Sequence, residues 1–236
     1  MKKENMIFIG IIVLLLVVLL VVVLITKKGD NNMMEDLKNI NYNVEGNEAS
    51  LEQYNTENPV VALYIKNYGS VVVELYPNIA PNTVNNFISL VKSGFYDKNT
   101  FHRLMPGFVL QGGDPTGTGT GDPGYKIKGE FTNNGFKNDL KHTKGVLSMA
   151  RGSYSMDSAG SQFFIMLGTA DYLDGNYAAF GKVIDGMDIV ERIEKNEVVK
   201  DPQSGQLQTN LTLEKAIVDL KGKEYPEVEK MNWDAS

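Results

Sequence analysis

The 236-residue chain contains no cysteine, only two histidines and a single tryptophan. Without cysteine it can form no disulfide, no zinc–thiolate site, no cysteine nucleophile and no thioether lipid anchor. With His102 and His142 as its only histidines, a multi-histidine metal site is excluded as well. We therefore expect neither a metal nor another cofactor.

Outside the N-terminus, basic residues are outnumbered by acidic ones. Residues 1–28 hold four lysines and one glutamate, so the rest of the chain keeps 19 of the 23 basic and 28 of the 29 acidic residues. Nucleic acids are bound through clusters of lysine and arginine, which neutralise phosphates. We therefore do not expect a nucleic-acid partner.

One long apolar run lies at the N-terminus. Met6–Ile25 is 20 residues long, and within it only Gly10 is not strongly apolar. As a helix, this run would span roughly 30 Å, which is the thickness of the hydrocarbon core of a bilayer. A cleaved signal peptide is the alternative, but its apolar region is shorter and ends in small residues, whereas Thr26-Lys27-Lys28 follows here.

We therefore predict a single-pass transmembrane anchor within residues 1–28 and a location at the cell membrane. Lysines flank the run on both sides, so the positive-inside rule barely discriminates between the two orientations. The short N-terminal tail favours an extracytoplasmic position for the rest of the chain. Residues 29–59 are polar and lack a regular period, which predicts a linker, and residues 223–236 are expected to form a C-terminal tail.

Residues 60–222 have the pattern of one folded domain rich in short strands. Val60–Ile65 and 71–76 flank the turn Asn67-Tyr68-Gly69, which predicts a hairpin. Helices are predicted from Pro81 to about Gly94 and over 187–194. Further strands are expected at 107–111, 145–149, 163–167, 179–183 and 216–220. Many short strands with two helices indicate a closed β-barrel with helices at its ends.

Four blocks of sequence carry the chemical signal. They read FHRLMPGFVLQGGD at 101–114, GVLSMA at 145–150, GSQFFI at 160–165 and LDGNYAAFGKV at 173–183. In this order and at this spacing they resemble the cyclophilin family, and the resemblance extends over roughly 60–221. It implies a mainly β fold, an eight-stranded antiparallel closed barrel capped by two α-helices, and peptidyl-prolyl cis–trans isomerase activity.

Such an activity has simple chemical requirements. The amide before proline rotates slowly because its partial double bond imposes a barrier of about 18–20 kcal/mol. Lowering that barrier requires an apolar pocket for the proline ring and a fixed donor that favours the twisted amide. A guanidinium suits this role because it is always charged and presents several rigid donors.

The resemblance assigns roles to individual residues. It implies that Arg103 contacts the substrate amide, that Gln111 positions Arg103 and that Phe108 belongs to the catalytic group. The residues expected to bind the proline and its neighbours are Val109, Ala150, Arg151, Phe164, Tyr172, Leu173 and Tyr177.

Several positions depart from the best-known family pattern. Val109 stands where many members carry methionine, and Tyr177 replaces a common histidine. Tyr172 occupies the position that is tryptophan in members highly sensitive to cyclosporin, so the indole donor is absent and weak cyclosporin binding is expected. Arg151 and the loop after it resemble the bacterial form of the family.

Other readings of the sequence have less support. Residues 119–124 match G-x-G-x-x-G, but Pro123 and a strand-like run follow where a dinucleotide site requires a helix. A noncatalytic module that holds proline-containing segments in the same groove remains the alternative function. We expect the protein to act on proline-containing polypeptides and to be a monomer.

Overall fold

The computed structural model describes residues 51–231. The predicted anchor at 6–25 lies outside this range, as does the predicted linker up to residue 50. Among residues 51–231, no helix combines the length and the apolar character needed to cross a membrane. The packed region includes Leu51, nine residues before the predicted domain start, because Leu51 is buried in one apolar cluster with Val60 and Ile217.

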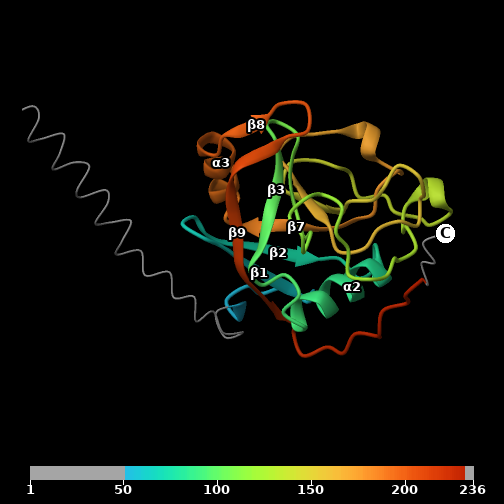
Figure 1. Ribbon diagram of the computed structural model, residues 1–236. Coiled ribbons are helices and arrows are strands. Elements are labelled where there is room, and N and C mark those ends of the chain that lie inside the picture. The colour runs from blue at the N-terminus through green and yellow to red at the C-terminus, as the bar shows by residue number, and fades with distance from the viewer. Residues whose placement is uncertain (1–50, 232–236) are drawn as a thin grey trace, which may run out of the picture. The chain divides into compact units, whose positions relative to one another are not determined.

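The described strands form one antiparallel sheet that closes on itself (Figure 1). Their order is β1-β2-β7-β5-β6-β4-β3-β9-β8, and a further pairing of β1 with β9 closes a barrel of eight strands, with β8 attached outside the ring. The predicted eight-stranded closed barrel is therefore confirmed. The strands are β1 (Val60–Ile65), β2 (Gly69–Leu75), β3 (Asn99–Met105), β4 (Val109–Gly112), β5 (Val146–Met149), β6 (Phe163–Met166), β7 (Ala179–Asp185), β8 (Val199–Asp201) and β9 (Gln206–Asp219).

Two α-helices accompany the barrel within the described residues, as predicted. Helix α2 (Pro81–Lys92) begins with proline at its first position, where the missing N–H costs nothing, and α3 (Met187–Asn196) buries Val190 and Ile193. Figure 1 shows the two helices on opposite sides of the barrel. Two short 3₁₀ turns, η2 (Thr132–Asn134) and η3 (Asp171–Leu173), lie in the connections. The segment after β9 runs back along α2, where Asn82 exchanges two hydrogen bonds with the backbone of Glu229.

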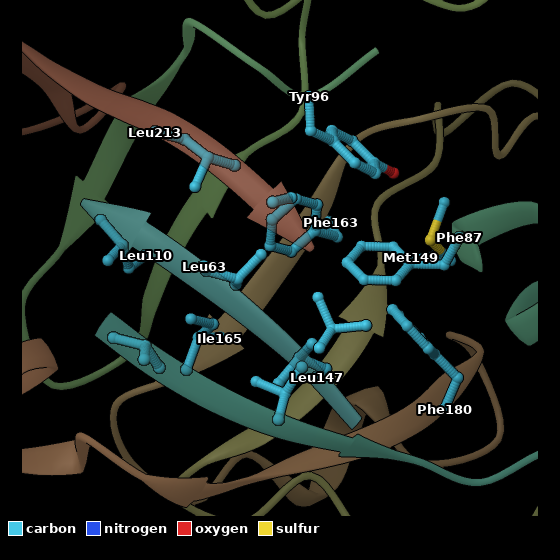
Figure 2. Close-up of a cluster of buried hydrophobic side chains, with 14 of the residues drawn as sticks. Leu63, Phe87, Tyr96, Leu110, Leu147, Met149, Phe163, Ile165, Phe180 and Leu213 are labelled. Carbon is cyan, nitrogen blue, oxygen red and sulfur yellow. The ribbon is translucent and has the colours of Figure 1, made fainter. Parts of the chain in front are cut away.

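Aromatic side chains fill the interior of the barrel (Figure 2). Phe163 of β6 lies at the centre, with its ring centroid 5.1 Å from that of Phe87 on α2 and 5.4 Å from that of Tyr96. Phe87 also lies 5.2 Å from Phe180 of β7, so α2 is packed directly onto the barrel core. All four rings are fully buried.

The period-two alternation of the strands places a second set of side chains on the outside. Phe163 and Ile165 face inward, whereas Phe164 between them belongs to a separate apolar cluster on the outer surface. On β4, Leu110 faces inward and Val109 joins the outer cluster. The same strands that pack the core therefore also carry an apolar patch outside it.

Strand β3 departs from this alternation. Phe101 and Leu104 are three residues apart and both belong to the interior cluster, which a regular strand does not allow. The pairing of β3 with β9 shifts register between Phe101 and Arg103, and this irregularity accounts for the change of face. It leaves Arg103 outside, paired with Gln111 of β4.

Not all strands were among those predicted. The expected strands did not include β3, β8 or the first ten residues of β9, which was expected only from residue 216. In the early part of β9, Leu207, Leu211 and Leu213 point inward but are separated by exposed polar residues. This segment therefore lacks the apolar density by which strands are recognised in a sequence.

A buried histidine connects three segments beneath the outer cluster. The Nδ1 atom of His142 lies 3.0 Å from Oδ1 of Asp174, next to η3, and Nε2 lies 3.0 Å from Oγ of Ser148 on β5. Because a carboxylate only accepts, Nδ1 carries the proton and Nε2 accepts from the Ser148 hydroxyl. The imidazole ring stacks on Phe164, with centroids 6.2 Å apart. His142 therefore fixes the segments that form the wall of the outer cluster.

Burial disfavours a charge on this imidazole. It lowers the pKa of His142, although the hydrogen bond and the charge of Asp174 act in the opposite direction. Burial similarly lowers the pKa of His102, against the attraction of Asp114. A histidine whose pKa is lower in the folded state than in the unfolded state, where it is about 6.5, contributes stability that is present above that pH and is lost as the pH falls.

We therefore predict that the free energy of unfolding falls as the pH is lowered from 7.5 to 5, in a range above that in which the carboxylates titrate. In His142→Gln this pH dependence should be weaker, because the side chain no longer takes up a proton on unfolding. Denaturant titrations at several pH values measure the effect. The chain has only two histidines, so a variant that also carries His102→Gln should be nearly independent of pH in this range. A wild-type stability that rises on acidification would contradict the prediction.

Candidate active site

The outer apolar cluster opens into a pocket of about 230 Å³. Nine of the ten predicted site residues line it, so the barrel brings together positions that are up to 74 residues apart in the sequence. The lining residues are Arg103, Phe108, Val109, Gln111, Ala150, Arg151, Phe164, Leu173 and Tyr177. The tenth, Tyr172, lies beside the pocket with its ring centroid 6.0 Å from that of Phe108, and it is 69% exposed.

The floor of the pocket is apolar. Val109, Phe164 and Leu173 are buried members of the outer cluster, and Phe108 and Tyr177 pack against it at the edge. The rings of Phe164 and Tyr177 meet edge to face, with centroids 6.0 Å apart. Such a surface suits a small apolar ring, which needs apolar contacts and no hydrogen-bonding partner.

One polar edge borders this floor, and its centre is Arg103. The Nη1 atom of Arg103 donates to Oε1 of Gln111 at 3.1 Å, and Nε donates to the backbone oxygen of Ser204 at 2.9 Å. Gln111 in turn donates from Nε2 to Oε1 of Gln162 at 3.0 Å. Gln162 donates to the backbone oxygens of Gly119 and Gly121, each at 3.0 Å. The guanidinium is therefore the end of a chain of hydrogen bonds anchored in the backbone.

Two residues of this series of hydrogen bonds were not predicted from the sequence. Gln162 lies in the block GSQFFI, where its polar side chain between glycine, serine and two phenylalanines was the only available signal. Ser204 contributes a backbone oxygen, which has no side-chain signature. Gln111, which the resemblance implies positions Arg103, accepts a hydrogen bond from Arg103 and itself donates one to Gln162.

Partial burial affects the pKa of Arg103. Burial lowers its pKa, while the nearby rings of Tyr177 and Tyr172 act to raise it. A guanidinium has so high an intrinsic pKa that it stays charged at neutral pH even so. The pocket therefore presents a fixed positive charge at one edge of an apolar floor.

The side chain of Arg151 packs at the rim of the pocket. Its Nε donates to the backbone oxygen of Asn176 at 2.9 Å, and its Cζ lies 4.8 Å from the ring centroid of Tyr177. The same guanidinium carbon lies 5.4 Å from the ring of Phe131. Arg151, which was expected to help bind the proline and its neighbours, thus also packs on the aromatic residue at the pocket rim.

A second hollow of about 300 Å³ adjoins the first and shares Gln111, Ala150 and Arg151 with it. Its far side includes the exposed ring of Tyr154. Among residues 51–231, no group of three or more histidine, aspartate or glutamate side chains could hold a metal ion. The two hollows together offer an extended chain an apolar pocket, a cation and a neighbouring polar surface.

Comparisons with known proteins agree with this geometry. Residues 60–218 match the family described as cyclophilin type peptidyl-prolyl cis-trans isomerase/CLD. The chain is 48% identical over 128 residues to peptidyl-prolyl cis-trans isomerase B of Bacillus subtilis, which covers 54% of this chain and 85% of that protein. It is 40% identical over 136 residues to the peptidyl-prolyl cis-trans isomerase of Helicobacter pylori, covering 57% of this chain and 80% of the relative.

A solved structure shares the fold. The crystal structure of a cyclophilin type peptidyl-prolyl cis-trans isomerase from Cryptosporidium parvum, determined in the presence of the dipeptide Ala-Pro, superposes with a TM-score of 0.60 at 32% identity. The match covers 68% of this chain and 98% of that one. On the match over residues 60–218, the closed barrel and these relatives, the chain belongs to the cyclophilin-type peptidyl-prolyl cis–trans isomerase family.

Proposed function

We propose that this chain accelerates rotation about X–Pro peptide bonds of polypeptide substrates, with the proline ring in the 230 Å³ pocket and Arg103 at the amide. Rotation removes the conjugation between nitrogen and carbonyl, so the nitrogen becomes pyramidal and regains a lone pair. In this mechanism an N–H of Arg103 donates to that lone pair, an interaction that the planar ground state cannot form. Stabilisation present only in the twisted state lowers the barrier.

The remaining pocket residues bind without taking part in bond rotation. Phe108, Phe164 and Leu173 bury the proline ring, which holds one side of the rotating bond. Ala150 lies where the chain before proline would pass, next to the second hollow. The crystal structure of the Cryptosporidium parvum relative was determined in the presence of the dipeptide Ala-Pro, which supports this class of substrate.

The observation that carries the proposal is the fixed guanidinium at the edge of an apolar pocket. A noncatalytic module that only retains proline-containing segments would need the floor of the pocket. It would gain nothing from an arginine held at the position of the amide, because a planar X–Pro amide offers its nitrogen no hydrogen bond.

We predict that Arg103→Ala lowers kcat/KM for an X–Pro peptide by about 100-fold or more, as expected for removal of a donor that acts in the transition state. The affinity for the ground-state peptide should change little, since the apolar floor is intact. A coupled isomerisation assay on the full-length chain in mild detergent measures the rate, and calorimetry measures the affinity.

Arg192→Ala is the matched control, since Arg192 also donates to a backbone oxygen, that of Tyr68, but does not line the pocket. It should keep the wild-type rate. Equal rates for wild type and Arg103→Ala would refute the catalytic role of Arg103. A wild-type rate no higher than the uncatalysed one would leave only the binding module.

We also propose that cyclosporin binds this chain weakly, because Tyr172 presents a phenol where an indole N–H would donate. Tyr172→Trp is expected to raise the affinity by roughly three- to tenfold, the range that one hydrogen bond contributes. Fluorescence titration measures it. Tyr154→Trp, which places a tryptophan on an equally exposed tyrosine position, should not raise the affinity. An equal gain in both variants would contradict the proposal.

We propose further that Met6–Ile25 tethers the domain to the cell membrane, with the isomerase domain on the extracytoplasmic side. The support is the length and composition of that run. The full-length chain should stay in the membrane fraction after an alkaline carbonate wash, and deletion of residues 1–28 should release it. External protease should digest the domain in intact cells. A mature protein whose mass lacks the N-terminal segment would refute the tether, and protection from protease would refute the orientation.

A further inference from the structure

The connection from β8 to β9 forms a tight turn over Asp201–Gly205. The carboxylate of Asp201 accepts a hydrogen bond from the backbone N–H of Gln203 at 2.9 Å and another from the hydroxyl of Ser204 at 2.8 Å. The backbone oxygen of Asp201 accepts from the N–H of Gly205 at 2.7 Å. One aspartate therefore organises every following residue of the turn except Pro202.

This turn is hydrogen-bonded to β3, the strand that carries Arg103. The backbone oxygen of Ser204 accepts from Nε of Arg103 at 2.9 Å, and that of Gly205 accepts from the N–H of Leu104 at 2.8 Å. Gly205 has a φ of 75°, and a Cβ on it would lie 2.6 Å from Sδ of Met105 and 2.8 Å from the backbone oxygen of Leu104. Only glycine fits there, because both the conformation and the space exclude a side chain.

The contact with Nε determines the orientation of the guanidinium. This group is planar, so a single hydrogen bond from Nη1 to Gln111 leaves it free to swing about that bond. A second bond at Nε, on another edge of the plane, removes this freedom. The two acceptors come from β4 and from the turn before β9, which are about a hundred residues apart and meet only in the folded barrel.

We infer that Asp201 is a positioning residue for the isomerase reaction: it shapes the turn that presents the Ser204 carbonyl to Arg103, and so fixes the plane in which the guanidinium meets the substrate amide. The inference rests on the proposed role of Arg103. The pKa of Asp201 is lowered, chiefly by the hydrogen bond from Ser204 and then by that from the Gln203 backbone, so the side chain is an ionised acceptor at neutral pH.

The first test is spectroscopic. In the full-length chain, the Nε–H of Arg103 should exchange slowly with solvent and be visible in nitrogen-15 NMR spectra, with its assignment given by its loss in Arg103→Lys. Asp201→Ala should speed that exchange by roughly three- to tenfold or more, the range set by a typical hydrogen bond. Asp201→Asn, which keeps an oxygen acceptor for Gln203, should lie between Asp201→Ala and wild type.

The matched control is Asp219→Ala. Asp219 lies at the other end of β9 and forms the same kind of turn, accepting from the backbone N–H of Lys221 at 2.7 Å and from its Nζ, also at 2.7 Å. It is not among the residues that line the pocket and is paired with Val60 of β1, so its loss should leave the exchange of Arg103 Nε–H unchanged. Any general loosening of the barrel from the loss of a turn aspartate would affect both variants.

The second test is kinetic. Asp201→Ala should lower kcat/KM for an X–Pro peptide by roughly three- to tenfold while the affinity for the peptide stays within twofold, since a misoriented donor weakens the transition state and not the apolar floor. Asp219→Ala should keep the wild-type rate. Ser204→Ala, which removes one of the two donors to the Asp201 carboxylate, should give a smaller loss in the same direction.

The outcomes separate this inference from the proposed function. If Arg103→Ala is slow but Asp201→Ala matches Asp219→Ala in both exchange and rate, only the positioning role is refuted. Faster exchange with an unchanged rate refutes it as well, as does a lower rate with unchanged exchange. If Arg103→Ala isomerises at the wild-type rate, the catalytic role of Arg103 fails and the inference fails with it.

Discussion

Hydrogen bonding of β1 to β9 closes the sheet, and the rest of the molecule depends on this closure. In a closed barrel each strand has an inner and an outer face, so successive residues are committed alternately to the core and to the surface. Phe163 packs the interior and Phe164 the pocket floor, although they are neighbours in the chain. Val109 and Phe164 of the pocket floor are therefore held in place by the same strands that hold the core, whereas Leu173 comes from η3 in the connection before β7.

Arg103 is placed on the outside of the barrel by a local exception to that alternation. Because the register of β3 against β9 shifts between Phe101 and Arg103, both Phe101 and Leu104 can fill the interior while Arg103 stays outside. Its guanidinium then meets Gln111 on one edge and the Ser204 carbonyl on another. The cost of fixing this charge is met during folding, so under the proposed mechanism the guanidinium would not have to reorganise when the substrate amide twists.

The sequence predicted the barrel and almost the whole pocket, because all but one of the residues that line it lie in four dense blocks with distinctive side chains, and the exception, Arg151, directly follows one of these blocks. It did not predict the groups that hydrogen-bond to these residues and hold them in place. Gln162 stands in one of those blocks, but its function depends on a partner 51 residues away. The turn at 201–205 acts on Arg103 through a backbone carbonyl, and no side-chain pattern records such a contact. The early part of β9 is a strand because of its pairing with β3, in spite of its polar composition. The proposed anchor depends on the sequence alone.

Two departures from the best-known family pattern can be understood together. Arg151 places its guanidinium carbon 4.8 Å from the ring of Tyr177, in the geometry of a cation–π contact. A tyrosine ring does not acquire a positive charge, so it does not repel that cation. A histidine at the same position would gain a positive charge near pH 6.5 and would then be repelled by the arginine beside it. With Arg151 in the loop, a tyrosine at the rim keeps an aromatic ring at this edge of the pocket without adding a second positive charge, so each of the two residues accounts for the other.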